Sequence, residues 1–396
     1  MIEPIVITGA GIVSAIGNNM METWESLKQQ QTGIGQLKYL KTNHHEFPVG
    51  EVKMSNEEMK QLLDITSEPT TRTSLMGMLA MREALENAGL NRTINEPVAL
   101  VSGTTVGGMD KSEQYYFDYL EGDTRNDYIK IHDCGATTEM IARHFGLFSM
   151  VTSISTACSS AANAIILGAN MIRKGMTEIV VVGGCECITK FHLNGFNSLM
   201  ILDPNQCKPF DANRAGLNLG EGAAYLVMET AASAHRRGAK ARALLSGYGN
   251  ACDAFHQTAS SDDGEGAFLA MQKALALASL KPEDIDYVNA HGTGTPNNDM
   301  SESQALFRIF GDQMPPVSST KGLTGHTTST CGSVEAIICM LALENGFIPT
   351  NYGWDSQMEG GITPITDIEY GKTLNHVMCN SFGFGGNDSC LIISHT

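Results

Sequence analysis

The chain has 396 residues, of which 42% are hydrophobic, and it carries a formal net charge of −17 at pH 7. This length and apolar content suffice for one large core or for two fused halves. The negative charge argues against binding to nucleic acid or to an anionic membrane. The sequence contains no run of 18 apolar residues, so we expect no transmembrane helix.

The N-terminal segment and the cysteines favour a cytoplasmic protein. Residues 1–8 enter an apolar strand without a basic region or a small-residue cleavage site, so we expect no signal peptide. The ten cysteines include no Cys-x-x-Cys pair, which argues against a disulfide framework. Cys185 and Cys187 with His192 could form a metal site, but no second ligand pair follows at zinc spacing. We favour a strand end with two small hydrophobic residues and expect no metal site.

Strands and helices alternate along the chain, which predicts an α/β fold built in layers. In chain order, the first half is expected to contain a strand at 5–8, a helix at 70–88, and strands at 98–102, 179–183 and 223–228. The second half is expected to contain a strand at 243–247, a helix at 266–277, strands at 285–289 and 317–319, a helix at 333–343, and strands at 377–381 and 390–394. The last two strands flank a glycine-rich loop and predict an antiparallel hairpin.

A short pattern repeats between the halves. One strand leads into Gly9-Ala10-Gly11, and another leads into Gly247-Tyr248-Gly249. We therefore expect two similar halves, 1–240 and 241–396, packed against each other. The first pattern also resembles the beginning of a dinucleotide-binding fingerprint, but a third glycine and a later acidic residue are missing. A glycine-rich structural turn is the favoured interpretation of residues 9–11.

Cys158 lies at the corner between an expected strand and an expected helix. Residues 151–154 are rich in β-branched side chains, and small residues follow as far as Ala162. Apolar residues then recur with helical spacing until Arg173, where a basic last turn and a glycine end the helix. A helix N-terminus stabilises a thiolate through its unpaired N–H groups and its dipole. We therefore expect Cys158 to be an activated nucleophile.

Two histidines follow short apolar strands in segments rich in glycine and threonine. His291 lies in an Ala-His-Gly-Thr-Gly-Thr segment, and His326 lies in a Leu-Thr-Gly-His segment. Open α/β sheets collect ligands at the carboxyl ends of their strands, so we expect both histidines at one site. An alternative starts from Ser318 and Lys321, which match the Ser-x-x-Lys motif of serine acylases. The Lys-Thr-Gly segment of those enzymes is missing, and we favour the histidine site.

The segment 380–387 contains three glycines around Phe384. Glycines let a backbone approach a ligand closely and adopt positive φ angles. The backbone N–H groups of this segment are suited to an oxyanion hole. A flexible hairpin tip explains the same composition, so both interpretations stay open at this point.

Together these segments resemble the β-ketoacyl-acyl-carrier-protein synthases of the elongating type II (Cys-His-His) class, within the thiolase superfamily. The resemblance covers essentially the whole chain. It rests on the motifs Thr156-Ala157-Cys158-Ser159-Ser160, Pro209-Phe210-Asp211, Gly220-Glu221-Gly222, His291-Gly292-Thr293-Gly294-Thr295, Lys321 with Gly325-His326, and Gly383-Phe384-Gly385-Gly386. It implies a thiolase-like five-layer α-β-α-β-α fold of two similar halves, with the nucleophile in the first half and the histidines in the second. It also implies a homodimer, or a heterodimer with a ketosynthase-like subunit.

The same resemblance implies a decarboxylative Claisen condensation. Cys158 would take an acyl chain from an acyl carrier protein, and malonyl carrier protein would then lose CO₂ and extend the chain by two carbons. His291 and His326 would stabilise the enolate, and the N–H groups of Cys158 and Phe384 would form the oxyanion hole. No cofactor of the chain's own is expected, because the carrier protein's phosphopantetheine carries both substrates.

Lys321 has two interpretations under this resemblance. It is expected to orient His326 or its hydrogen-bond network, and it is also suited to a structural ion pair with Glu335. The two interpretations are compatible with each other.

Five further residues resemble the part of these enzymes that contacts the substrate. Thr293 and Thr295 resemble the pair that binds pantetheine, although two threonines here could also simply cap a turn. Phe384 resembles a gate that moves to admit the acyl chain, and Gly383 and Gly385 give it hinges. The family's interface for the carrier protein is basic. The candidate members of such a patch here are Lys60, Arg72, Arg125, Lys130, Lys208 and Arg214.

Sub-types of the superfamily differ at their catalytic residues. Degradative thiolases carry a second catalytic cysteine, initiating synthases carry asparagine, and chain-length-factor subunits lack the nucleophile, whereas this chain has Cys158 and His326. Departures from the common pattern at 213–216, 327–331 and 387–388 support an alternative to housekeeping fatty-acid elongation. That alternative is an aryl-polyene or polyketide ketosynthase acting with a chain-length-factor subunit. The intact Cys-His-His set argues against a thiolase and against a non-catalytic subunit that only shapes a tunnel.

Overall fold

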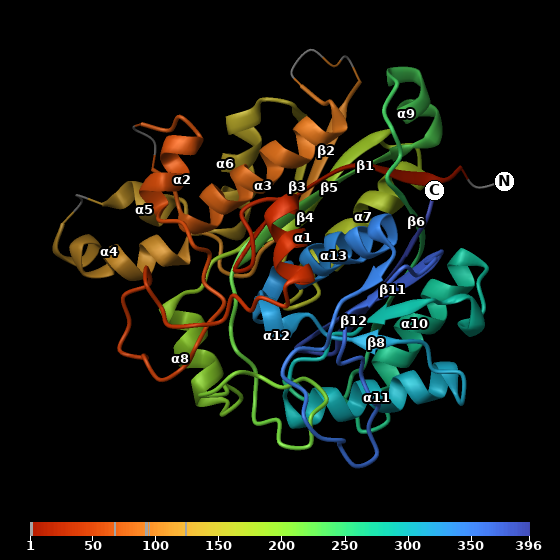
Figure 1. Ribbon diagram of the computed structural model, residues 1–396. Coiled ribbons are helices and arrows are strands. Elements are labelled where there is room, and N and C mark those ends of the chain that lie inside the picture. The colour runs from red at the N-terminus through yellow and green to blue at the C-terminus, as the bar shows by residue number, and fades with distance from the viewer. Residues whose placement is uncertain (1–2, 67–68, 92–93, 95, 123–124) are drawn as a thin grey trace.

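The computed structural model describes residues 3–66, 69–91, 94, 96–122 and 125–396 (Figure 1). Its strands are β1 Ile5–Ser14, β2 Val98–Gly103, β3 Phe148–Ile154, β4 Ile179–Glu186, β5 Gly222–Thr230, β6 Ala243–Cys252, β7 Tyr287–Asn289, β8 Val317–Ser318, β9 Phe347–Ile348, β10 Glu369–Tyr370, β11 His376–Gly383 and β12 Asn387–Ser394. Its helices are α1 Met20–Lys28, α2 Asn56–Leu62, α3 Arg72–Ala88, α4 Met109–Glu121, α5 Asn126–Lys130, α6 Cys134–Phe145, α7 Ser160–Arg173, α8 Lys190–Ser198, α9 Ala231–Arg237, α10 Glu265–Ala278, α11 Pro296–Phe310, α12 Lys321–Thr324 and α13 Cys331–Asn345.

Ten strands form one sheet in the order β3-β2-β4-β5-β1-β6-β12-β11-β7-β8. The sheet narrows in the middle, because β1 pairs with β5 over most of its length but with β6 only through Val6 and Ile7. Helices α7 and α13 contact each other and the inner faces of the two half-sheets, while α3 and α6 cover one outer face and α10 and α11 the other (Figure 1). This arrangement confirms the expected five-layer fold. The division into 1–240 and 241–396 stays a prediction.

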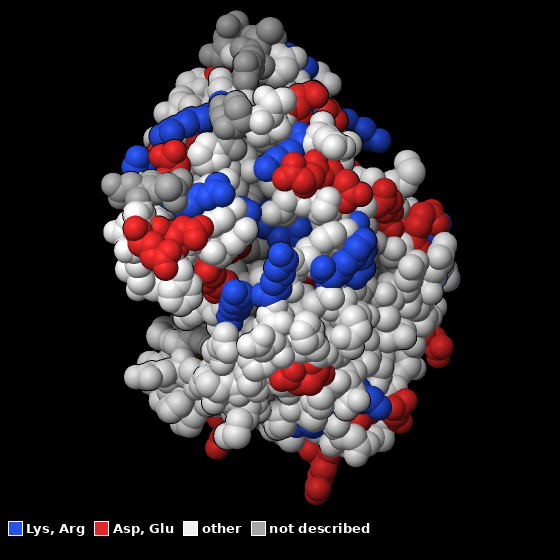
Figure 2. Space-filling model, turned by 90° about the vertical axis from the view of Figure 1, so that its left-hand side faces the viewer, with Lys and Arg blue, Asp and Glu red and all other residues white. Residues whose placement is uncertain are grey.

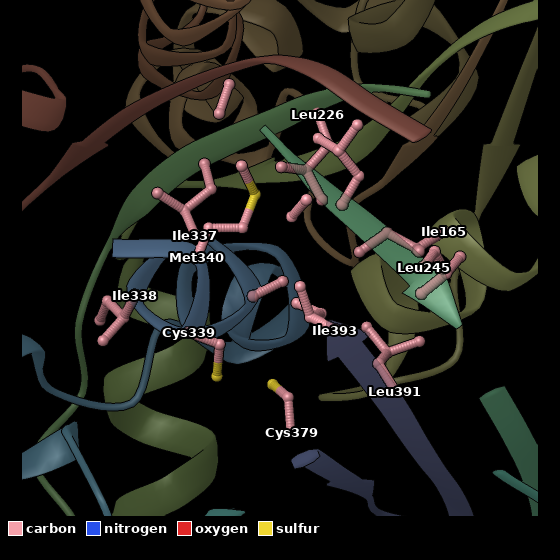
Figure 3. Packing of buried hydrophobic residues seen from close by; sticks show 14 of the residues in the cluster. Ile165, Leu226, Leu245, Ile337, Ile338, Cys339, Met340, Cys379, Leu391 and Ile393 are labelled. Atoms are coloured by element: carbon pink, nitrogen blue, oxygen red, sulfur yellow. The ribbon is translucent and has the colours of Figure 1, made fainter. Parts of the chain in front are cut away.

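Helix α13 is the centre of the core. Its residues from Cys331 to Leu343 are all buried, as a helix between two sheet layers requires apolar side chains on every side. Figure 3 shows Ile337 and Met340 on one side of this helix and Cys339 facing Cys379 of β11 on another. The central position of α13 matters for the site, because its first turn lies beside the predicted catalytic residues.

The expectation of a glycine-rich turn at residues 9–11 is wrong, because β1 continues through them to Ser14. A Cβ atom on Gly9 or Gly11 would lie 2.3 or 2.1 Å from a backbone oxygen of α3. In β6, a Cβ atom on Gly247 or Gly249 would lie 2.3 or 2.2 Å from a backbone oxygen of α10. The repeated pattern therefore lets a helix pack closely on a strand at equivalent places in both halves.

The other expected elements are confirmed, most with longer bounds, whereas α3, β7 and β8 are shorter than predicted. Helix α3 begins after the N-cap Thr71 and ends at Gly89, which adopts a left-handed conformation with φ 65°. Strands β11 and β12 form the expected antiparallel hairpin from His376 to Ser394. This hairpin carries the Phe384 loop at its tip and brings it back to the Cys158 corner.

Candidate active site

Cys158 lies in a tight turn between β3 and α7, two residues before the first helical residue. Ala157 has φ 49°, a left-handed conformation that is strained for a residue other than glycine. The Ser160 hydroxyl holds this turn, since it donates to the Ala157 carbonyl at 2.7 Å and accepts from the Thr156 N–H at 2.8 Å. The predicted position of Cys158 near a helix N-terminus is confirmed.

The His291 segment is held by two acidic residues of α11. Glu302 accepts the backbone N–H groups of His291 and Gly292 at 2.9 and 2.8 Å. Asp299, one turn earlier on the same face, accepts the N–H of Thr293 at 3.0 Å. Both carboxylates are buried. They position the His291 ring through its backbone, which leaves the imidazole free to face the pocket.

His326 does not follow a strand directly, contrary to expectation, because the single turn of α12 separates it from β8. Its backbone instead pairs with the segment before β5. The His326 N–H donates to Asn218 at 2.7 Å, and its carbonyl accepts from Gly220 at 2.8 Å. The Thr328 N–H donates to the Nδ1 atom of His326 at 3.0 Å. Both the backbone and the ring of His326 are therefore fixed.

The predicted residues meet at a pocket of about 290 Å³. The rings of His291 and His326 lie almost perpendicular, with centroids 5.3 Å apart. The predicted residues that line the pocket are Cys158, His291, Thr293, Thr295, His326, Gly383, Phe384 and Gly385. Lys321 and Glu335 do not line it and lie buried behind the histidines.

Lys321 contacts His291, where the sequence suggested His326. Its ammonium group donates to the His291 carbonyl at 2.5 Å and lies 3.3 Å from the His291 Nδ1 atom. It also forms the expected ion pair with Glu335, at 2.5 Å. Burial alone would lower the pKa of Lys321, but the charges of Glu335 and its neighbours outweigh burial and raise it. Lys321 therefore stays a cation against the ring of His291.

The Ser-x-x-Lys alternative has no geometric support. The hydroxyl of Ser318 bonds to the hydroxyl of Tyr287 at 2.8 Å, within the buried sheet. Ser318 does not line the pocket that holds Cys158. The lysine of this motif is bound to His291 and Glu335 instead of serving a serine nucleophile.

The Phe384 loop closes over the nucleophile. The backbone N–H of Phe384 acts on the Cys158 thiol and lowers its pKa, in the position that an oxyanion hole built from Cys158 and Phe384 would require. Gly385 and Gly386 have φ angles of 84° and 77°, which glycine adopts without strain. The Phe384 ring stacks on Phe196 of α8 with centroids 5.9 Å apart. The loop is the tip of the hairpin, as one interpretation expected, and its role as an oxyanion hole stays a prediction.

Thr293 and Thr295 also combine their two interpretations. Their hydroxyl groups lie 2.8 Å apart, and the Thr293 hydroxyl accepts the backbone N–H of Thr295 at 3.2 Å. Thr295 is the N-cap residue of α11, but its side chain makes no capping hydrogen bond. Both threonines thus form a turn and line the pocket, and their role in binding pantetheine stays a prediction.

The resting structure does not stabilise the thiolate that the helix N-terminus led us to expect. Burial raises the pKa of the Cys158 thiol to about 12, and Lys321 and the Phe384 N–H oppose this only in part. Burial, together with the charge of Lys321, lowers the pKa values of His291 and His326 well below their ordinary range. The closed pocket thus holds a neutral thiol beside two neutral imidazoles.

A partly buried cluster of side chains connects the Cys158 turn to the hairpin, and sequence reasoning missed it. The Asn387 side-chain oxygen accepts from Ser159 at 2.8 Å, from Asn163 at 2.6 Å and from Asn250 at 2.9 Å. The sequence offered one signal, the departure from the family pattern at 387–388. Because the four residues come from α7, β6, β12 and the turn before α7, no local pattern could have joined them.

The possible metal site is not formed. Within the described ranges, no group of three His, Cys, Asp or Glu side chains is arranged to hold a metal ion. Cys185 and Cys187 are fully buried at the end of β4, where Tyr225 and Thr73 respectively donate to their sulfur atoms. Both cysteines are thus small buried residues at a strand end. Of the helices in the described part of the chain, none combines the length and apolar character needed to cross a membrane.

Comparison with protein-family models gives two matches. Residues 2–234 match the model "Beta-ketoacyl synthase, N-terminal domain", and residues 242–355 match "Beta-ketoacyl synthase, C-terminal domain". Together the two matches include every residue that lines the pocket as far as His326, and they cover well over half of the chain.

Similar proteins span the same length. Nodulation protein E of Rhizobium meliloti (strain 1021) is 34% identical, with 98% of both chains covered. The 3-oxoacyl-[acyl-carrier-protein] synthase 2 of Staphylococcus aureus (strain COL) is 31% identical, with 98% of this chain and 97% of the relative covered.

Among solved structures, "The ishigamide ketosynthase/chain length factor" superposes with a TM-score of 0.93 at 28% identity, with both chains fully covered. A ketosynthase in complex with its chain length factor from Xenorhabdus doucetiae gives a TM-score of 0.84 at 29% identity, covering 100% of this chain and 98% of the other. With the pocket, the fold and the family models in agreement, the chain belongs to the β-ketoacyl synthase family.

Proposed function

We propose that the chain is a 3-oxoacyl-acyl-carrier-protein synthase that condenses an acyl-cysteine intermediate with malonyl-acyl carrier protein. The product is a fatty acid, polyketide or polyene chain extended by two carbons. One observation carries this proposal: a single pocket places the Cys158 thiol, an N–H donor from Phe384 and two neutral histidines together. Such a pocket has a nucleophile and two sets of donors, as condensation through a covalent intermediate requires.

The first step is acyl transfer to Cys158. Its sulfur attacks the thioester carbonyl, the carbonyl oxygen becomes an oxyanion, and the N–H groups of Cys158 and Phe384 hold it. The carbon–sulfur bond to the carrier then breaks, and the proton lost by Cys158 ends on the pantetheine thiol. Because burial is the largest cause of the raised pKa of Cys158, opening of the Phe384 loop would lower that pKa and favour attack.

The second step uses the two histidines. An ammonium or an amide N–H can only donate, so the Nδ1 atoms of His291 and His326 accept from Lys321 and Thr328. The ring proton of each neutral imidazole is therefore on Nε2. Two Nε2–H groups can donate to the thioester carbonyl of the malonyl group and stabilise the enolate that forms when CO₂ leaves. The enolate carbon attacks the acyl carbonyl, the bond to sulfur breaks, and Cys158 regains a proton.

Lys321 acts through His291 in this proposal and is a positioning residue. Its ammonium fixes the tautomer of His291, and its pairing with Glu335 offsets the cost of burying a charge. Thr293 and Thr295 present hydroxyl groups suited to the amides of a pantetheine arm, and their place on the pocket wall supports this role. No cofactor of the chain's own enters any step, because the phosphopantetheine belongs to the carrier.

An acyl carrier protein is the proposed partner, and a docking surface for an acidic protein needs basic side chains. Figure 2 shows Lys and Arg side chains interspersed with Asp and Glu around a hollow on one face of the molecule. A pocket of about 710 Å³ has a mixed lining, with the basic residues Lys41, Arg72, Lys111 and Lys190 and the acidic residues Glu51, Glu57, Asp110, Glu113 and Glu221. Of the candidates from the sequence, Arg72 is buried in an ion pair with Glu221 and is not available for docking.

A second ketosynthase-like subunit, identical or different, is the other proposed partner. Helix α4 buries none of its residues, and it exposes Phe117 and Leu120 to 74% and 61%. Strand β3 is the outermost strand of the sheet and is only partly covered. Exposed apolar side chains and a free strand edge each favour pairing with another chain. We also propose a cytoplasmic location, which fits the acidic, disulfide-free chain.

The alternative is a specialised aryl-polyene or polyketide ketosynthase that works with a chain-length-factor subunit. It is favoured by the similarity to two structures whose names pair a ketosynthase with a chain length factor, at 28% and 29% identity. In such a pair, Cys158 would make this chain the catalytic member. The reaction at Cys158 is the same in both cases, and only the acyl chain differs.

Mass spectrometry of the intact protein tests the proposal. The wild type, incubated with a panel of acyl carrier proteins loaded with different acyl chains, is expected to gain the mass of an acyl group on the peptide that contains Cys158. The Cys158→Ala variant is expected to gain none. An unmodified wild-type protein with every acyl length, alone and with the candidate partner subunit, would refute the proposed enzyme.

A further inference from the structure

Cys331 is a buried thiol in contact with a catalytic histidine. It is the first residue of α13, it is 1% exposed, and its sulfur lies 3.2 Å from the Nδ1 atom of His326. The hydroxyl of Thr327 contacts the same sulfur at 3.6 Å. No step of the proposed reaction uses this thiol, although it touches the ring that the reaction requires.

The direction of the contact follows from its neighbours. The Thr328 N–H donates to the Nδ1 atom of His326, so Nδ1 carries no proton and can only accept. A sulfur atom in contact with an unprotonated nitrogen must itself be the donor. Burial raises the pKa of Cys331 although Lys321 opposes this, so the thiol keeps its proton. The contacts therefore run from the Thr327 hydroxyl to sulfur and from the Cys331 S–H to Nδ1.

We propose that Cys331 is a positioning residue that donates its S–H to His326 and holds the ring in the tautomer that presents Nε2–H to the pocket. This inference rests on the proposed function, in which Nε2–H stabilises the enolate. The thiol also withdraws electron density from Nδ1, which makes the opposite Nε2–H a stronger donor.

Both histidines then have a hydrogen-bond donor at Nδ1, but the donors differ in charge. His291 has a charged donor, Lys321, at its Nδ1 atom, whereas the single lone pair of His326 Nδ1 is shared by two neutral donors, an amide and a thiol. One neutral hydrogen bond contributes less than one to a charged group. The second donor at His326 helps to compensate for the weaker hydrogen bonds that neutral groups make.

Two half-reactions measured on three proteins test the role of Cys331. The wild type, Cys331→Ala and Cys331→Ser are each assayed for acyl transfer to Cys158 and for CO₂ release from malonyl-acyl carrier protein. Cys331→Ala is expected to slow CO₂ release about tenfold, a factor typical of one lost hydrogen bond, and to leave acyl transfer within about twofold. Cys331→Ser keeps a donor and is expected to restore most of the lost rate.

Equal loss of both half-reactions in Cys331→Ala, or unchanged CO₂ release, would overturn the inference. So would a serine variant as slow as the alanine variant while its acyl transfer is normal. Nitrogen-15 NMR of the histidine rings adds a readout that does not depend on activity. The His326 signals, identified with His326→Gln, are expected to show one pure Nε2–H tautomer in the wild type and a mixture in Cys331→Ala. If the wild type forms no adduct and releases no CO₂, the proposed function fails instead, and the tautomer measurement still stands alone.

Discussion

The two walls of the pocket are built in different ways. The wall with Cys158 consists of a strained turn and a glycine-rich hairpin tip. The opposite wall with His291 and His326 is held by buried carboxylates, an ammonium group and backbone hydrogen bonds. In the proposed reaction, acyl transfer uses the wall that carries the nucleophile, whereas decarboxylation uses the fixed donors of the opposite wall. Each half-reaction can therefore be removed without the other.

The largest expected effect is on the first wall. Cys158→Ala removes the nucleophile and is expected to lower acyl transfer by at least about 10⁴-fold. The histidine wall is intact in this variant, so CO₂ release from malonyl carrier protein is expected to stay within about tenfold of the wild type. Both rates are measured on the same preparation, with Cys252→Ala as the control for loss of an exposed cysteine. Loss of both activities in Cys158→Ala would mean that the walls do not act independently.

The converse variant removes one donor from the second wall. His326→Ala is expected to slow CO₂ release about 10²- to 10³-fold, the usual effect of losing one such donor, while acyl transfer to Cys158 continues. His235→Ala, which removes an exposed histidine on α9, is the matched control. Parallel loss of transfer and decarboxylation in His326→Ala would contradict the assigned role.

Lys321→Met tests the buried ion pair between Lys321 and Glu335, which lies behind the histidines. Removing one partner leaves Glu335 buried and unpaired, and breaking a buried pair in this way costs about 3–5 kcal/mol of unfolding free energy. The double variant Lys321→Met with Glu335→Gln removes the unpaired charge and is expected to recover most of that stability, but not CO₂ release. Urea unfolding gives the free energies. A single variant as stable as the wild type would show that the ion pair contributes nothing.

The smallest effect is a pH dependence. Since burial lowers the pKa values of His291 and His326 well below the ordinary value of about 6.5, both rings stay neutral at pH 6. CO₂ release is therefore expected to stay nearly constant from pH 8 down to pH 6, with its decline only at lower pH. Circular dichroism at each pH confirms that the protein is folded. A rate that halves between pH 7 and 6.5 in folded protein would show that one histidine titrates normally.

The sequence predicted the residues that line the two walls of the pocket better than the residues that hold them in place. Cys158, His291 and Phe384 were found because each lies at the end of a strand in a short, recognisable segment. The support of Asn387 was missed because its partner Ser159 is 228 residues away. The predicted acidity of Cys158 was wrong for a similar reason, since burial in the fold raises the pKa of its thiol in spite of the local helix N-terminus. Gly9 was assigned to a turn because the close approach of α3 is visible only in the fold.

The most direct test of the central claim follows both walls in one single-turnover experiment. Wild-type protein carrying an acyl group on Cys158 is isolated, mixed with malonyl-acyl carrier protein, and followed by mass spectrometry and by CO₂ release. The account predicts that the adduct disappears as one CO₂ is released per site and that the carrier gains a 3-oxoacyl chain two carbons longer. Loss of the adduct without CO₂ and without a longer chain would contradict it.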